Sequence, residues 1–294
     1  MSGRLAVAKT YKLFINGGFP RSESGRSVAV KGKRGGVFAH VCQGSRKDLR
    51  DAVEAARAGQ KKWGDATAYN RGQVMYRMAE MLEGKAEEFA QVLSETTGET
   101  PAGAKRQVQS AVDRLVCFAG WTDKFAQVLG CNNPVAGPYY NFTIPEATGV
   151  IGAVMGSAGK APALLGMITL ISAPMCAGNA VVLCADERCA VTAAVLGEVC
   201  ATSDVPAGVV NIVTGKIAEL REHLAKHREV DGIFAAGVSE EDAEIFRGGA
   251  AENLKRVRIL EMDAEEWMDA EACGHPWMIE PFVEMKTVWH PSST

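Results

Sequence analysis

The sequence has 294 residues, a formal net charge of −3 and an isoelectric point of about 6.0. Hydrophobic residues make up 47% and charged residues 23%, which is typical of a globular protein that buries a sizeable core. The slightly acidic balance favours neither a nucleic acid nor an anionic membrane surface as a partner, and we expect neither.

The first 130 residues predict a short β segment followed by helices. Alternating residues over Tyr11–Phe19 predict an edge hairpin, and Val28–Val41 predicts two short strands around a Gly-Gly turn. Ser45 is a favourable N-cap with Asp48 three residues later, so the first helix should begin there. Apolar residues at helical spacing predict four helices, over residues 49–63, 74–82, 89–93 and 104–119.

Turn signals at residues 132–138 end the helical pattern, and a strand is predicted at Pro138–Pro145. Five apolar strands are predicted after it, at Gly149–Met155, Asn179–Cys184, Gly208–Thr214, Asp231–Ala235 and Arg256–Glu261. Helices are predicted between them, at Ala161–Ala177, Ala190–Ala201, Ile217–Lys226 and Glu240–Ala251. This order predicts a Rossmann-like α/β fold, in which helices cover both faces of a parallel sheet and ligands bind at the carboxyl ends of the strands. The sequence contains no G-x-G-x-x-G motif.

The uncharged stretch Ala161–Leu183 is long enough to cross a membrane. Because two prolines and two glycines interrupt it, we interpret it as a buried helix followed by a buried strand. The first ten residues hold no apolar run of the length of a secretory signal, so we expect a cytoplasmic protein. The eight cysteines form no Cys-x-x-Cys pair, and we expect free thiols and assign no metal site.

The order of these elements and several short motifs resemble the aldehyde dehydrogenase superfamily. Leu13-Phe-Ile-Asn-Gly-Gly-Phe resembles its opening hairpin, and Phe118-Ala-Gly-Trp-Thr-Asp-Lys resembles the end of its long helix. Four further segments resemble parts of its nucleotide-binding domain: Gly149-Val-Ile-Gly, Ala177-Gly-Asn-Ala-Val-Val-Leu, Val205-Pro-Ala-Gly-Val-Val-Asn-Ile-Val-Thr-Gly and Asn253-Leu-Lys-Arg-Val. The resemblance implies a nucleotide-binding domain made of residues 1–130, an N-terminal helical segment, and residues 149–262.

A second resemblance concerns the family's protruding β oligomerisation arm. The family's last strand is matched by Phe282, Val283, Glu284, Met285, Lys286, Thr287 and Val288, and the resemblance implies an arm built from residues 131–148 and 279–294. Between Glu261 and Phe282 the family carries its catalytic domain. About 20 residues stand there in this chain, far fewer than the ~100 that a domain needs. We interpret residues 263–278 as a short linker that replaces the catalytic domain.

The family's reaction needs a thiolate, an oxyanion donor, a general base and a nicotinamide. Cys273, two residues before His275, is the one candidate nucleophile after the last predicted strand, and an inert loop cysteine is the alternative. Glu261 matches the family's base, but the two glycines that follow it in the family are Asp263 and Ala264 here, so we interpret it as vestigial. The family's oxyanion Asn is missing from its turn, where Ser157 is expected to be a helix N-cap instead.

The family's cofactor site is only partly matched. Glu187 is kept, but Cys184 replaces the Lys that reaches the adenosine ribose in the family. Gly237 and Ser239 could present backbone N–H groups to a pyrophosphate, yet residues 240–242 place three carboxylates beside them. We therefore expect weak or absent NAD(P) binding.

Three functions stay open at this point. The favoured one is a catalytically inactive subunit, structural or regulatory, that assembles with a full-length aldehyde dehydrogenase paralogue. The second is an NAD(P)-dependent aldehyde oxidoreductase, active alone or in complex. The third is a nucleotide-binding sensor.

Overall fold

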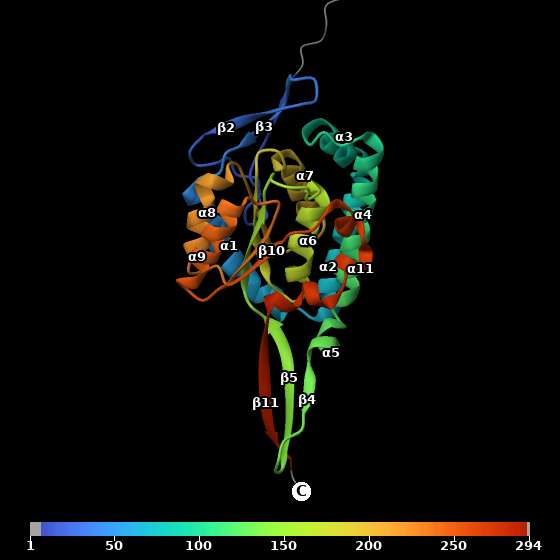
Figure 1. Cartoon of the computed structure of the whole chain (residues 1–294), viewed down its shortest axis with the longest axis vertical. Helices are drawn as coiled ribbons and strands as arrows, with labels where there is room; N and C mark the ends of the chain where they lie inside the picture. Colours follow the sequence, from blue (N-terminus) through green and yellow to red (C-terminus); the bar gives the residue numbers. More distant parts are fainter. Residues whose placement is uncertain (1–6, 293–294) are drawn as a thin grey trace, which may run out of the picture.

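Five parallel strands form the centre of the molecule (Figure 1). In the computed structural model, which describes residues 7–292, they lie in the order β10-β9-β6-β7-β8. Their bounds are β6 (Val150–Met155), β7 (Ala180–Ala185), β8 (Val210–Thr214), β9 (Gly232–Ala236) and β10 (Arg256–Leu260). Every pairing in this sheet is parallel, so the predicted Rossmann-like sheet is confirmed.

Helices cover both faces of the sheet, as predicted. One face packs against α6 (Ala163–Cys176) and α7 (Ala190–Thr202), and the other against α1 (Arg46–Asp65), with α8 (Ile217–Lys226) and α9 (Glu240–Ala251) beside it. Side chains of β6 alternate between the two cores, because successive residues of a strand point to opposite faces. Ile151 and Ala153 lie in the core under α6, whereas Val150 and Val154 lie in the core under α1.

The N-terminal helices form an outer layer over α6 and α7. They are α2 (Ala68–Gly84), α3 (Ala86–Thr96) and α4 (Pro101–Trp121), followed by the short α5 (Phe125–Leu129). At one end of the molecule lie β1 (Lys9–Tyr11), β2 (Ser27–Lys31) and β3 (Val37–Cys42). The predicted capping box is present, because the Ser45 hydroxyl accepts from Asp48 N and the Asp48 carboxylate accepts from Ser45 N.

The predicted edge hairpin at Tyr11–Phe19 takes a different form. β1 pairs in parallel with β3, and only a tight turn at Asn16 and Gly17, both with positive φ, joins Ile15 to Gly18. The stretch Ala161–Leu183 is the fully buried α6 followed by β7, and Pro174 lies inside that helix. Among the described residues, no helix is both long and apolar enough to cross a membrane.

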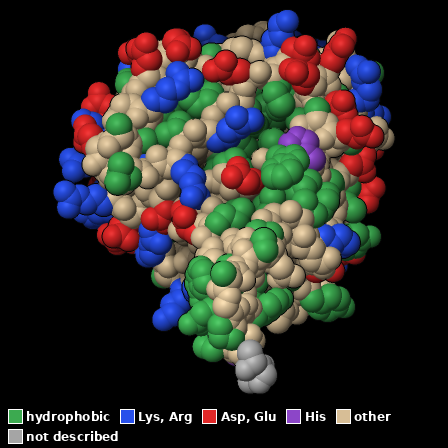
Figure 2. Space-filling model, turned by 60° about the horizontal axis from the view of Figure 1, so that its bottom comes forward, with side chains coloured by type: hydrophobic (Ala, Val, Ile, Leu, Met, Phe, Trp, Pro, Cys, Tyr) green, Lys and Arg blue, Asp and Glu red, His purple; other side chains and the backbone are tan. Residues whose placement is uncertain are grey.

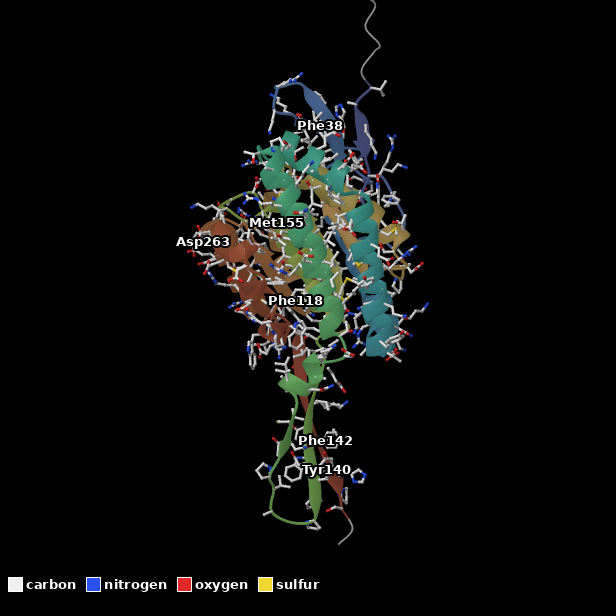
Figure 3. The ribbon with its side chains drawn as sticks, turned by 90° about the vertical axis from the view of Figure 1, so that its right-hand side faces the viewer. Phe38, Phe118, Tyr140, Phe142, Met155 and Asp263 are labelled. Carbon is white, nitrogen blue, oxygen red and sulfur yellow. The ribbon has the colours of Figure 1, made fainter. Side chains whose placement is uncertain are left out.

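A narrow three-stranded sheet extends from the domain (Figures 1 and 3). It consists of β4 (Cys131–Asn133), β5 (Tyr139–Ala147) and β11 (Val283–Pro291), in the order β11-β5-β4. β11 is antiparallel to β5 along its whole length, so it is an edge strand with one side paired. The strand begins one residue later than the predicted arm strand and continues three residues beyond it. We call this sheet the arm.

Phe282 does not lie on the arm. It ends a short 3-10 turn (Glu280–Phe282), its side chain is buried, and its ring lies 4.6 Å from that of Phe234 in β9. Its carbonyl oxygen accepts a hydrogen bond of 2.9 Å from Asn179 Nδ2. Phe282 therefore anchors the arm to the core of the domain.

Residues 263–278, predicted as a short linker, are folded and form a cap on the domain. The cap contains α10 (Ala264–Met268), α11 (Ala270–Cys273) and a 3-10 turn (Pro276–Met278). Asp263, which stands where the family has a glycine, starts α10 as the N-cap of a capping box with Glu266. The cap begins on the outside of the domain, where Figure 3 shows Asp263.

A buried arginine fixes the cap to the domain. Arg114 of α4 is 3% exposed and donates to Thr169 Oγ1 at 2.9 Å and to the carbonyl oxygens of Trp267 and Asp269 at 3.1 and 3.4 Å. The Trp267 side chain is fully buried. The cap thus covers one side of α4 and α6.

Candidate functional site

A hollow lies at the carboxyl end of the sheet, where the strand order reverses. The chain runs outward through β6, β7 and β8 and then returns to the other side of β6 to form β9. Ligands of open α/β sheets bind at such a switch point. The hollow has a volume of about 380 Å³, within the range of small-molecule pockets. It is lined by Ala158, Gly159, Lys160, Ala161, Gly237, Val238, Leu260, Glu261, Met262, Asp263 and Trp267.

The loop after β6 covers part of the switch point. Gly156 N donates to Ala236 O at 2.9 Å, and Ala158 N donates to Gly237 O at 2.8 Å. Gly237 has a φ of +63°, and a Cβ on Gly156 would overlap the Gly237 carbonyl. Ser157 does not cap α6, contrary to the prediction, because the helix begins at Ala163 without a side-chain cap. The close backbone contact between the two glycines holds the loop over β9.

The hollow brings together two of the predicted site residues, Glu261 and Gly237. The Glu261 side chain is 72% exposed and has one cation nearby, Arg247 at 3.6 Å. Two further lining residues were not predicted from the sequence, Trp267 and Lys160, and Lys160 has no ion-pair partner among the described residues. The Gly-Lys pair directly after a predicted strand was a signal for Lys160, whereas nothing local marked Trp267.

Ser239 starts α9 but does not line the hollow. Its hydroxyl accepts from Asp242 N and donates to Asp242 Oδ2 at 2.7 Å. Arg221 binds the same carboxylate at 2.6 Å and Glu241 at 2.7 Å. Burial would raise the pKa of the Asp242 carboxyl, but the hydrogen bonds from Arg221 and Ser239 outweigh it and hold the pKa below its ordinary value. The positive end of α9 is thus already matched with carboxylates of the chain.

Cys184 and Glu187 follow β7 and also lie outside the hollow. The Cys184 side chain is 1% exposed, and burial raises the pKa of its thiol to about 12. Its short apolar side chain ends inside the core, so it cannot replace a lysine that reaches a ribose. Glu187 Oε1 is buried and has no hydrogen-bond partner in the structure.

Cys273 is buried in the cap, away from the hollow. Its Sγ donates to the Glu266 carbonyl oxygen at 3.4 Å and lies 3.8 Å from Met262 Sδ. Burial raises the pKa of its thiol above the ordinary value. All eight cysteines are free, and residues 7–292 contain no group of three His, Cys, Asp or Glu that could hold a metal ion.

Comparisons with known proteins agree on one family. The model of the family described as "Aldehyde dehydrogenase family" matches residues 20–266. Aldehyde dehydrogenase family 2 member B4, mitochondrial, of Arabidopsis thaliana is 32% identical over 258 residues, which are 84% of this chain and 46% of that protein. Benzaldehyde dehydrogenase, mitochondrial, of Antirrhinum majus is 29% identical over 255 residues, again 84% of this chain and 46% of its own.

The solved structures give the same picture. The NAD+ complex of an aldehyde dehydrogenase from Bacillus cereus has a TM-score of 0.78 at 26% identity, covering 88% of this chain and 54% of that one. The chain therefore spans about half the length of the relatives it matches.

Proposed function

The chain belongs to the aldehyde dehydrogenase family, and from that membership we propose that it is a non-catalytic subunit, structural or regulatory, that assembles with a full-length aldehyde dehydrogenase. One combination of features carries the proposal: the arm keeps a long strand with an unpaired edge, while the lining of the hollow includes no thiol. Its eleven lining residues include no Cys, His or Asn. The chain would then contribute binding surface and not chemistry.

The cysteine nearest in sequence to the hollow is poorly suited to attack an aldehyde. A thiol must ionise to become a good nucleophile, and cysteines that do so sit in electropositive, partly exposed places. Cys273 is buried and its pKa is raised, so it is protonated at neutral pH. Its hydrogen bond to a backbone carbonyl further stabilises the protonated form.

Glu261 is likewise poorly suited to act as a base. A catalytic carboxylate is usually tuned towards neutral pH by an apolar environment. With 72% of its side chain exposed and a cation 3.6 Å away, Glu261 resembles an ordinary surface carboxylate.

The nicotinamide cofactor of the family also fits this chain poorly. Cys184 offers no group for the ribose, and Glu240, Glu241 and Asp242 surround the start of α9 with negative charge. A pyrophosphate there would have to displace the bond between Asp242 and Arg221 or accept repulsion from the exposed carboxylates. We propose weak or absent NAD(P) binding and derive no reaction step through it.

The arm supports assembly through strand addition. β11 leaves one edge unpaired over its length, and an unpaired edge invites a strand from another chain. Large apolar side chains are exposed on the same sheet, at Tyr139, Tyr140, Ile144, Met285 and Trp289. Figure 2 shows hydrophobic side chains over the arm and next to its base. A full-length relative has a catalytic-domain sheet that this chain lacks, so the arm of this chain is expected to bind such a partner.

Two proline variants test this mode of assembly. Neighbouring residues of a strand direct their N–H groups to opposite edges, so Lys286→Pro and Thr287→Pro remove one N–H that faces β5 and one that faces the free edge. The Thr287 N–H faces the free edge and the Lys286 N–H faces β5. We expect Thr287→Pro to lose co-purification with a co-expressed full-length aldehyde dehydrogenase while its thermal stability stays close to that of the unmodified chain. Lys286→Pro should mainly lower stability.

Two results would overturn the proposal. One is a chain that stays monomeric and captures no full-length relative at micromolar concentrations. The other is NAD(P)-dependent oxidation of aldehydes by the purified chain that Glu261→Gln abolishes, which would establish the oxidoreductase alternative. Micromolar NAD binding without turnover would favour the sensor instead.

A further inference from the structure

A second pocket lies between α1 and α8, on the face of the sheet opposite α6. It has a volume of about 470 Å³ and shares no lining residue with the hollow at the carboxyl end. Six of its eight lining residues are basic, with one acid, Glu222, and one apolar residue, Leu49. The basic residues are Arg46, Arg50, His223, Lys226, His227 and Arg228. We call this site the basic pocket. Its charge contrasts with the net charge of −3 of the whole chain.

Several of these cations have no acidic partner of their own. Arg50 lies 3.6 Å from Asp51 and 3.7 Å from Glu54, and Lys226 lies 3.3 Å from Glu252. Within the described part of the chain, the three remaining exposed basic groups (Arg46, His223 and Arg228) have no carboxylate within 4.0 Å. Like charges gathered without counter-charges repel one another, and a bound anion removes that repulsion.

His227 adds a directed donor. Its Nδ1 accepts the Glu229 N–H at 3.2 Å, so the neutral ring carries its proton on Nε2. Burial, and then the nearby charge of Lys255, lowers the pKa of this histidine, so the neutral ring is its main form at neutral pH. The guanidinium groups can meanwhile bind two oxygens of one phosphate at once.

We propose that the basic pocket binds a small phosphate-bearing anion, such as pyrophosphate or the terminal phosphates of a nucleotide. The pocket volume is in the range of small-ligand sites. Carboxylates lie along its borders: Asp51 and Glu54 on α1, Glu229 just after α8, and Glu252 at the end of α9, where it pairs with Lys226. They would repel an extended polyanion, which distinguishes a small ligand from a nucleic acid or an anionic membrane.

Inorganic pyrophosphate is the probe for the test, by calorimetry on the whole chain in low-salt buffer. The double variant Arg46→Gln, Arg228→Gln removes the two arginines that have no acidic partner. We expect saturable binding by the unmodified chain and a Kd raised at least about tenfold in this variant. The matched control is Arg21→Gln, Arg34→Gln, which removes two exposed arginines that likewise have no ion-pair partner among the described residues and should change Kd by less than about twofold.

Three outcomes would refute the basic pocket as a phosphate site. They are no saturable binding, an equal loss of affinity in the control variant, and equal affinity for sulfate at the same ionic strength. Tighter binding of a short oligonucleotide or of anionic vesicles would refute the small ligand. Tighter binding of ADP than of pyrophosphate would support the proposal and identify a nucleotide. A titration with NAD on the same double variant separates this site from the family's cofactor site, because the variant should weaken binding of pyrophosphate and leave any binding of NAD at the cofactor site unchanged.

Discussion

Trp267 provides the most direct test of whether residues 263–278 form a structural cap. The sequence predicted a linker there, and substitutions in a solvated linker change stability by less than about 0.5 kcal/mol. In the structure the Trp267 side chain is fully buried, and the carbonyl of the same residue accepts from the buried Arg114. We predict that Trp267→Ala destabilises the whole domain and not only the cap.

The expected magnitude combines two opposing effects. Truncating a buried tryptophan to alanine costs about 3–5 kcal/mol through lost burial and the cavity it leaves. The Trp267 indole N–H has no hydrogen-bond partner in the structure, and a buried unpaired donor costs about 1–3 kcal/mol, which the truncation relieves. The net loss should therefore be about 2 kcal/mol, which corresponds to a fall in Tm of about 3 °C for a chain of 294 residues.

Urea unfolding followed by circular dichroism measures this loss directly. Trp267→Phe is the matched control, because it keeps an aromatic ring in the cap and removes the unpaired N–H. It should cost less than about 1 kcal/mol. A loss below about 0.5 kcal/mol for Trp267→Ala, or an equal loss in both variants, would refute the interpretation of the cap.

Three further predictions follow from the charges and thiols. Arg221→Gln should lower the free energy of unfolding by about 1 kcal/mol at pH 6, and by less towards pH 2, as urea unfolding at both pH values would measure. The reason is that the pKa of Asp242 is lower in the folded chain than in the unfolded chain, so its ionised carboxylate stabilises the fold above the unfolded pKa, and this stabilisation is lost as the pH falls through the folded pKa. Burial lowers the pKa of Lys255 to about 8, so between about pH 8 and 10 this lysine is protonated more in the unfolded chain than in the folded chain. The free energy of unfolding should therefore rise with pH over that range, and Lys255→Met should remove the rise. Iodoacetamide at pH 7.5 should label the exposed Cys131 much faster than the buried Cys273, as peptide mass spectrometry would show, and equal rates would contradict the proposed inert role of Cys273.

The sequence was sufficient to predict the central sheet because each strand carries its own signal. Val150–Met155 and Ala180–Ala185 are short continuous apolar runs, and their length of six residues favours a strand buried on both faces over a buried helix such as α6. Ser45 and Asp48 predicted the start of α1 for a similar reason, since a capping box is a local interaction between residues three apart. Features of this kind depend on few distant contacts.

The parts that the sequence did not predict depend on distant contacts. The burial of Trp267 and the position of the cap depend on Arg114, more than a hundred residues earlier in the chain. The capping box of Asp263 and Glu266 that starts α10 is by contrast a local signal. Phe282 continues the apolar pattern of β11, but its contact with Phe234 turns it into the core. Lys160 was not predicted because the resemblance to the family assigns roles to Glu261 and Ser239 but none to a lysine in this loop. Local patterns predicted elements, whereas the site depends on how those elements meet.

The cap and the arm together bear on why the chain would need a partner. The cap covers the side of α4 and α6, so the domain does not need another chain to bury that surface. The arm has no such cover. Lys286 pairs with Glu146 across the sheet and Pro291 ends the strand, and both are common protections of an edge, but Met285 and Trp289 on the same strand are 44% and 59% exposed. Apolar residues on an extended, unpaired edge are a liability in a free monomer. A strand added by a partner would pair this edge and help to cover these side chains, and the two proline variants test that contact.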